Sequence, residues 1–132
     1  MSQSRITATI GSQLYKIDIH TATNEIVSDE PKALGGQDSG FSPSELLAAS
    51  LGACTCATLR MYADRKGWAL LDIKADVTFE RDKANNRSIF TRTIELIGDL
   101  DAEQRARLLD IANKCPIHQA LTNPIEVNTQ LL

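Results

Sequence analysis

The sequence has no strong excess of one charge and no long apolar run, and we expect no targeting segment. Its 132 residues carry 14 Lys and Arg against 17 Asp and Glu, and these charges are scattered, which argues against a nucleic-acid-binding or acidic-membrane surface. The first ten residues lack a basic region followed by an apolar one, and the weakly polar run 46–57 is too short to span a bilayer. We therefore expect a cytoplasmic protein that binds neither nucleic acid nor membrane.

Cysteine is scarce, and internal repeats, low-complexity segments and domain linkers are missing. Three cysteines, an odd number, favour a reduced compartment over a secreted disulfide framework. A chain of this length can bury roughly two thirds of the surface that its unfolded form exposes, so it needs no metal or disulfide merely to fold. We expect a single domain over residues 1–132.

Hydrophobic periodicity and capping signals predict the elements. Strands are expected at residues 5–10, 14–20, 25–29, 71–80, 88–98 and 125–131. Helices are expected at residues 43–66, 103–114 and 116–121. A loop with Pro and Gly but no apolar period fills residues 30–41. This order of strands, long helix, two strands, helices and a strand predicts an α+β fold.

The helix over residues 43–66 is the most distinctive expected element. Ser42 and Glu45 form an S-x-x-E capping box, and Pro43 suits the first helical position. The first half of the helix is apolar or small on every side, which argues that it is buried within the protein. Such a helix must be wrapped by a sheet, and if one chain has too little sheet, a partner chain must help.

Cys54 and Cys56 lie in this helix, where each residue turns about 100°, so their side chains point about 200° apart. The two residues can neither pair nor bind one metal while the helix is intact. This weakens the hypothesis of a structural zinc site that also uses Cys115 and His118, and we expect Cys56 to be a packing residue. In the simplest interpretation Cys54 is an ordinary core cysteine, because it belongs to a stripe of residues at helical spacing: Leu47, Leu51, Cys54, Thr58 and Met61.

Cys115 precedes Pro116 at a predicted helix start, where unpaired N–H groups and the helix dipole favour an anion and hence a thiolate. His118 lies three residues further on and could stabilise that thiolate, although a surface or hydrogen-bonded histidine is the commoner case. A thiol in a buried helix and a thiol at a helix start together make a candidate peroxidatic and resolving pair. Two plain structural cysteines are the commoner alternative.

Two segments carry a resemblance to a known family: DEPKALGGQDSGFSPSELLAASLGACTCATLRMYADRKGW and GDLDAEQRARLLDIANKCPIHQAL. They resemble the OsmC/Ohr family of osmotically induced and organic hydroperoxide resistance proteins, and specifically its OsmC-like subgroup. The match runs from about Asp29 to the C-terminus, and the N-terminal hairpin fits more loosely. The resemblance implies an OsmC-like fold, in which antiparallel sheets of an intertwined homodimer wrap long central helices, with no cofactor and no metal.

The resemblance also implies an activity, the thiol-dependent reduction of organic hydroperoxides, with a dithiol reductant as the second partner. Cys54 matches the cysteine that attacks the peroxide and becomes a sulfenic acid. Cys115 matches the resolving cysteine that converts the sulfenic acid into a disulfide. The resemblance therefore makes Cys54 and Cys115 the two catalytic cysteines.

The family supports its attacking thiol with an arginine from the N-terminal hairpin, which a glutamate holds. Here the arginine position falls near Ser12 or Gln13, and the glutamate position falls on Ser44. Glu45, one residue further on, is therefore the third candidate catalytic residue, and the positive charge could come from Arg5 or Lys16. This departure motivates the alternative function, a non-catalytic protein that binds a small molecule in an apolar pocket.

Overall fold

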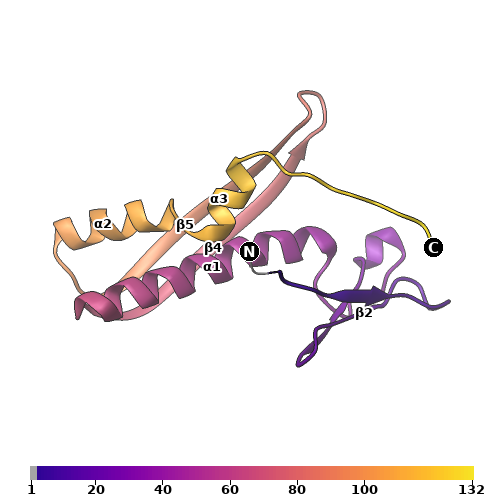
Figure 1. The fold of residues 1–132 in the computed structure, drawn as a ribbon, viewed down its shortest axis with the longest axis horizontal. Helices are drawn as coiled ribbons and strands as arrows, with labels where there is room; N and C mark the ends of the chain where they lie inside the picture. Colours follow the sequence, from indigo (N-terminus) through magenta and orange to yellow (C-terminus); the bar gives the residue numbers. More distant parts are fainter. Residues whose placement is uncertain (1–2) are drawn as a thin grey trace. The chain divides into compact units, whose positions relative to one another are not determined.

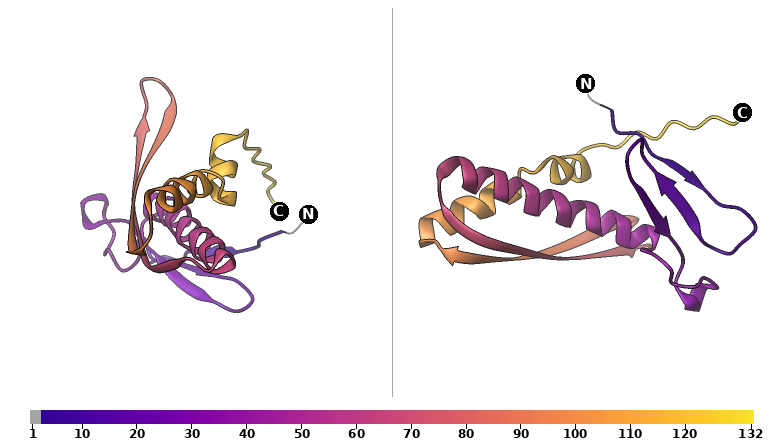
Figure 2. Two further views of the ribbon diagram at one scale, coloured as in Figure 1. Left: turned by 90° about the vertical axis from the view of Figure 1, so that its left-hand side faces the viewer. Right: turned by 90° about the horizontal axis from the view of Figure 1, so that it is seen from below.

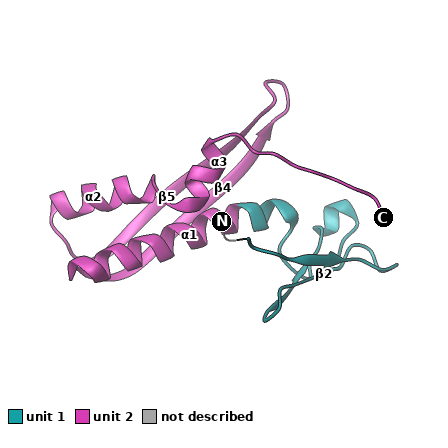
Figure 3. Ribbon diagram, in the orientation of Figure 1, with its two compact units in different colours: residues 1–47 teal, residues 48–132 magenta. Residues whose placement is uncertain are grey.

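The computed structural model describes residues 3–132, and the chain divides into two compact units, residues 1–47 and residues 48–132 (Figure 3). The first unit contains a three-stranded antiparallel sheet, and the second contains a two-stranded antiparallel sheet with helices. The predicted α+β class is therefore confirmed, as is the long helix after the first three strands.

The first unit is built around β1 (Thr7–Thr9), β2 (Ile17–His20) and β3 (Glu25–Ser28), which pair in the order β1-β2-β3. After β3 comes the predicted loop, which contains one short 3₁₀ helix, η1 (Lys32–Leu34). This helix ends at Gly35, whose φ of 92° lies in the left-handed region that glycine adopts without a steric penalty.

A buried carboxylate, that of Asp29, organises this loop. Its Oδ1 accepts hydrogen bonds from the backbone N–H groups of Glu30 at 2.8 Å and Tyr15 at 3.3 Å. Its Oδ2 accepts from the Ser39 hydroxyl at 2.6 Å and from the backbone N–H groups of Gln37 and Ser39, both at 3.2 Å. The Ser39 hydroxyl, helped by these backbone donors and opposed by burial, lowers the pKa of Asp29 to about 2.

The second unit contains a long β-hairpin with helices alongside it (Figures 1 and 2). Its elements are most of α1 (Pro43–Lys66), β4 (Ala69–Asp82), β5 (Arg87–Asp99), α2 (Ala102–Ala112) and α3 (Pro116–Thr122). The two strands stay in antiparallel register from Ala69 opposite Asp99 to Asp82 opposite Arg87, with one irregularity between Leu70 and Asp72. Asp101 and Gln104 form the predicted capping box at the start of α2.

The core of this unit lies between one face of the hairpin and the two longer helices. Its buried members are Leu59, Ala63, Leu70, Leu100, Leu108 and Ala112. The partly buried Ile73, Ile94 and Leu96 pack against it from β4 and β5. Ile73 is paired with Leu96 in the strand register, so these side chains share a face of the sheet, and α1 and α2 both cover that face.

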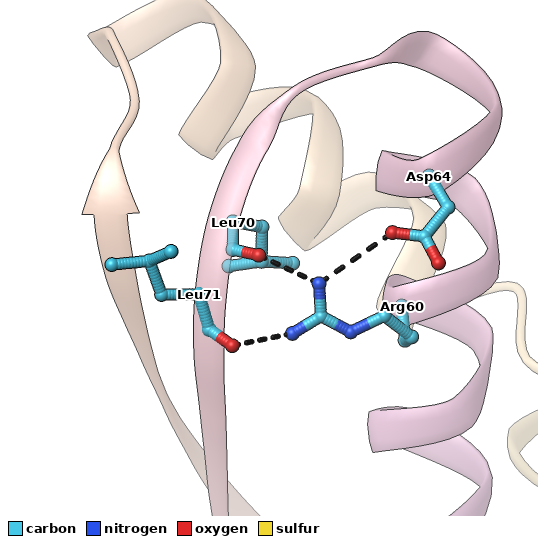
Figure 4. Close-up of polar contacts among 4 residues, drawn as sticks. All are labelled: Arg60, Asp64, Leu70 and Leu71. Carbon is cyan, nitrogen blue, oxygen red and sulfur yellow. Dashed lines mark hydrogen bonds and ion pairs between the residues drawn. The ribbon is translucent and has the colours of Figure 1, made fainter.

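Arg60 ties α1 to the beginning of β4 (Figure 4). Its Nη1 donates a hydrogen bond of 2.6 Å to the carbonyl oxygen of Leu70, and its Nη2 donates one of 2.6 Å to that of Leu71. Asp64, one helical turn further along α1, lies 3.6 Å from the same guanidinium. One side chain thus satisfies two carbonyl groups of the strand.

The predicted strand over residues 125–131 is wrong for the described chain. Residues 124–132 have no regular secondary structure, and Val127 is 82% exposed. A strand needs a neighbouring strand for its backbone hydrogen bonds, and within residues 3–132 this segment pairs with none.

Within a single chain the predicted packing stripe of α1 is not buried at either end, because Leu47 is 41% exposed and Met61 is 64% exposed. The buried stripe of α1 uses spacings of four instead: Leu51, Thr55, Leu59 and Ala63. The rest of this long helix is half-buried or exposed in the described chain. By length and composition alone α1 could also cross a membrane, a property that the core helix of a globular protein shares.

Candidate functional site

The two cysteines predicted to be catalytic occupy different structural settings within the second unit. Cys54 is half-buried in α1, and its Sγ lies 3.9 Å from the Thr58 hydroxyl, one turn further along. Cys56 faces β4 instead, with its Sγ 4.0 Å from the carbonyl oxygen of Ile73, which agrees with a packing role. All three cysteines are free thiols.

Cys115 is the N-cap residue of α3, as predicted, and Pro116 follows it at the helix start. Its side chain is completely buried, and its Sγ accepts a hydrogen bond of 3.4 Å from the backbone N–H of His118. The sulfur therefore satisfies one of the N–H groups that a helix start leaves unpaired.

Glu45 serves as a helix cap, which is the structural part of its predicted role. Its side chain accepts a hydrogen bond of 2.9 Å from the backbone N–H of Ser42, and its own N–H donates one of 3.2 Å to the Ser42 hydroxyl. This reciprocal pair is the predicted capping box at the start of α1. Its side chain is exposed, and its catalytic role stays a prediction.

Arg92 of β5 joins three elements at one guanidinium group. Its Nη1 donates a hydrogen bond of 2.9 Å to the hydroxyl of Thr55 in α1. Its Nη2 donates to Oδ1 of Asn113, which ends α2, at 3.0 Å, and contacts Nδ1 of His118 in α3 at 3.1 Å. Arginine has no acceptor, so Nδ1 of His118 must be the acceptor in that contact.

His118 is consequently held as a neutral imidazole with its proton on Nε2. Burial lowers the pKa of His118, and the charge of Arg92 lowers it further. His118 is thus a hydrogen-bonded histidine, the commoner of the two cases considered, and it reaches Cys115 through its backbone N–H.

Arg92 contacts a residue next to each of the two predicted catalytic cysteines. Thr55 directly follows Cys54 in α1, and His118 contacts Cys115. A cation thus sits between the two thiol-bearing elements, and its source is β5 of the second unit. Arg5 and Lys16, which the sequence suggested for this charge, belong to the first unit.

Sequence reasoning missed Arg92, although a signal was present. In β5 the residues Phe90, Ile94 and Leu96 alternate on the face that the helices cover, and Arg92 occupies the inward position between Phe90 and Ile94. An arginine at an inward position of a half-buried strand needs polar partners from the covering layer. Thr55, Asn113 and His118 provide them.

A cavity of about 330 Å³ opens beside this cluster. Leu51, Phe90 and Leu121 contribute to its apolar wall, and Arg87, Arg92 and His118 contribute to its polar wall. The described residues 3–132 contain no group of three or more side chains of His, Cys, Asp or Glu that could hold a metal ion. The charged and titratable groups that line this cavity are two guanidinium groups and one imidazole.

A family model for OsmC-like proteins matches residues 36–130 of this chain. An uncharacterised protein of Acinetobacter baylyi is 27% identical in an alignment of 108 positions that covers 77% of this chain and 73% of that protein. The family model spans the long helix and both predicted catalytic cysteines.

Solved structures resemble the chain as well. An OsmC-like protein of Mycoplasma pneumoniae has a TM-score of 0.78 at 21% identity, covering 91% of this chain and 87% of that one. An organic hydroperoxide resistance protein of Bacillus subtilis has a TM-score of 0.63 at 23% identity, covering 92% of this chain and 91% of that one. At these identities the likeness shows the fold, which is OsmC-like, as predicted.

Proposed function

We propose that this chain, which belongs to the OsmC-like protein family, is a thiol-dependent peroxidase that reduces organic hydroperoxides. The observation that carries the proposal is the position of Arg92. Its guanidinium links Thr55, the neighbour of Cys54, to His118, whose backbone N–H contacts Cys115. Thiolate chemistry at neutral pH needs a nearby cation or hydrogen-bond donor. The His118 N–H is a donor to Cys115, and Arg92 is a cation bonded to the residue that directly follows Cys54.

The burial of the two sulfurs supports their division of labour. Cys54 is half-buried and Cys115 is fully buried, so a peroxide that enters from solvent meets Cys54 first. The Cys54 thiolate attacks one peroxide oxygen and the O–O bond breaks. The alkoxide that this releases takes up a proton and leaves as the alcohol, and Cys54 becomes a sulfenic acid.

Resolution follows from attack of the Cys115 thiol on that sulfenic sulfur, which forms the S–S bond and releases water. Closure of the bond requires the two Cα atoms to lie within about 7 Å. A dithiol reductant then converts the disulfide back to two thiols and is itself oxidised to a disulfide. Each turnover thus consumes one peroxide and one dithiol.

We also propose that the protein acts as a homodimer in the cytoplasm. On α1 the side chains of Leu47 and Met61 are 41% and 64% exposed in one chain, although the first half of the helix is apolar or small on every side. A second copy would remove such surface from water, and each of these side chains would contribute part of the roughly 1.5 to 3 kcal/mol that complete burial gives. Free cysteines support a reducing compartment.

The test of the peroxidase is the consumption of cumene hydroperoxide by reduced protein with a dithiol reductant. We expect Cys54→Ser to abolish turnover, and Cys115→Ser to allow one sulfenic acid per chain but no disulfide. Cys56→Ser is the matched control, since it makes the same change two residues away in the same helix, and it should keep the wild-type rate. An undiminished rate in Cys54→Ser would contradict the proposal.

A second candidate function is the binding of a small molecule without catalysis, which the cavity with its apolar wall favours. Intact-mass analysis separates the two functions. One equivalent of peroxide should remove two thiols rapidly and yield a Cys54 to Cys115 crosslink in a peroxidase. Slow and indiscriminate oxidation would favour the binding protein.

A further inference from the structure

The charge of Arg92 has no carboxylate partner among residues 3–132. All three of its hydrogen-bond partners, the Thr55 hydroxyl, the Asn113 side chain and the His118 ring, are neutral. A guanidinium has five N–H donors, and these three contacts use only three of them. A half-buried cation with spare donors and no counter-charge favours an anion at the open side of the group.

That open side faces the cavity of about 330 Å³, because Arg92 and His118 both line it. Arg87 lines the cavity too, but its Nε already lies 3.5 Å from Oδ2 of Asp82. No aspartate or glutamate of the described residues lines the cavity, so nothing there repels a negative ligand. One unpaired guanidinium matches one negative charge.

The apolar part of the cavity wall determines which tail the bound anion can carry. Leu51, Phe90 and Leu121 present apolar surface within the same cavity. A group that docks on Arg92 would therefore extend its tail over these side chains, which stabilises an apolar tail and not a polar one. The volume lies at the low end of the range for ligand cavities, about 300 to 1,000 Å³, so the ligand is small.

We propose that this cavity is a binding site for a small monocarboxylate with an apolar tail. Arg92 anchors the carboxylate, for which its planar donors are suited, and the aliphatic and aromatic side chains of the wall hold the tail. Thr55, Asn113 and His118 fix the guanidinium in place, so the anchor is formed before the ligand arrives. Neither thiol takes part, so the site works whether or not the protein reduces peroxides.

The experiment is isothermal titration of the reduced full-length protein with hexanoate and with 1-hexanol, which have similar tails but differ in charge. We expect hexanoate to bind at least tenfold more tightly than hexanol, and its affinity to fall as salt is raised. Equal affinities of the wild-type protein for the two compounds, or no hexanoate binding, would overturn the proposal without any variant being needed.

Variants then locate the site. Arg92→Gln should lose at least tenfold in hexanoate affinity and should bind hexanol as the wild type does, which also reports that the cavity is intact. Arg107→Gln is the matched control, because Arg107 pairs with Tyr62 elsewhere in this unit, and it should leave hexanoate binding unchanged. Unchanged hexanoate binding in Arg92→Gln would exclude this site. Cys54→Ser should keep full hexanoate binding, so failure of the peroxidase and failure of this site are separate results.

Discussion

The hydrogen bond between Thr55 and Arg92 provides a quantitative test of how this unit is built. Thr55 is completely buried, and its hydroxyl donates to the Leu51 carbonyl oxygen at 2.7 Å while it accepts from Arg92 at 2.9 Å. Thr55→Val keeps the shape of the side chain and removes the acceptor. The Leu51 carbonyl keeps its helical hydrogen bond, so the loss falls on Arg92.

The expected cost follows from the charge on the donor. A hydrogen bond to a charged group contributes about 1.5 to 3 kcal/mol, so Thr55→Val should lower the free energy of unfolding by that amount. Thr55→Ser is the matched control, because it keeps the hydroxyl and loses one methyl group, worth roughly 1 kcal/mol. In urea, where the slope for a protein of this size is about 2 kcal/mol per molar, Thr55→Val should lower the midpoint by about 1 M.

A double-mutant cycle with Arg92→Met isolates the contact. In the Arg92→Met background the Thr55→Val change should lower the free energy of unfolding only slightly, because no guanidinium is left to lose its acceptor. The coupling free energy between the two changes should be about 1 to 3 kcal/mol. Protein concentration must be held constant, because association also stabilises the folded chain. If Thr55→Val costs the same in both backgrounds, the guanidinium does not depend on this hydroxyl and the reasoning fails.

Two further predictions concern the first unit. The pKa of Asp29 is about 2 when folded and 3.8 ordinarily, so its carboxylate stabilises the fold above about pH 4 and this contribution disappears as pH falls from about 4 to about 2. Urea unfolding should show Asp29→Asn to be less stable than wild type at pH 7, with the difference shrinking across that window; a constant difference would contradict the assignment. At Gly40 an added Cβ would overlap the Val27 carbonyl oxygen, so Gly40→Ala should destabilise by more than about 1 kcal/mol, whereas Gly11→Ala, with open space around it, should not. Equal stabilities of the two alanine variants would refute the steric argument.

Local signals were read correctly from the sequence because they involve neighbouring residues. The start of α1 follows from the reciprocal hydrogen bonds between Ser42 and Glu45, and the N-cap position of Cys115 follows from the proline at position 116. These rules operate over three or four residues, a distance at which the chain itself brings the groups together.

Features that depend on distant residues were not predictable in the same way. Which stripe of α1 is buried depends on where the hairpin lies, so the choice of Thr55 over Cys54 and Thr58 required the structure. Arg92 meets partners that lie 37 and 26 positions away in the chain. The failure of the strand at 125–131 has the same origin, because alternation predicts a strand but does not provide its pairing partner.

The connectivity of residues 48–132 also has a consequence for the order of folding. Residues 83–86 alone separate β4 from β5, and two residues separate α1 from β4 and β5 from α2. Short connections cost little loop-closure entropy, so we expect these adjacent elements to assemble early and quickly. The bond from Arg92 to Thr55 spans 37 residues, so it closes only after that scaffold exists. A kinetic intermediate of this unit would therefore contain helices and a hairpin, and it would gain its candidate site in the last step.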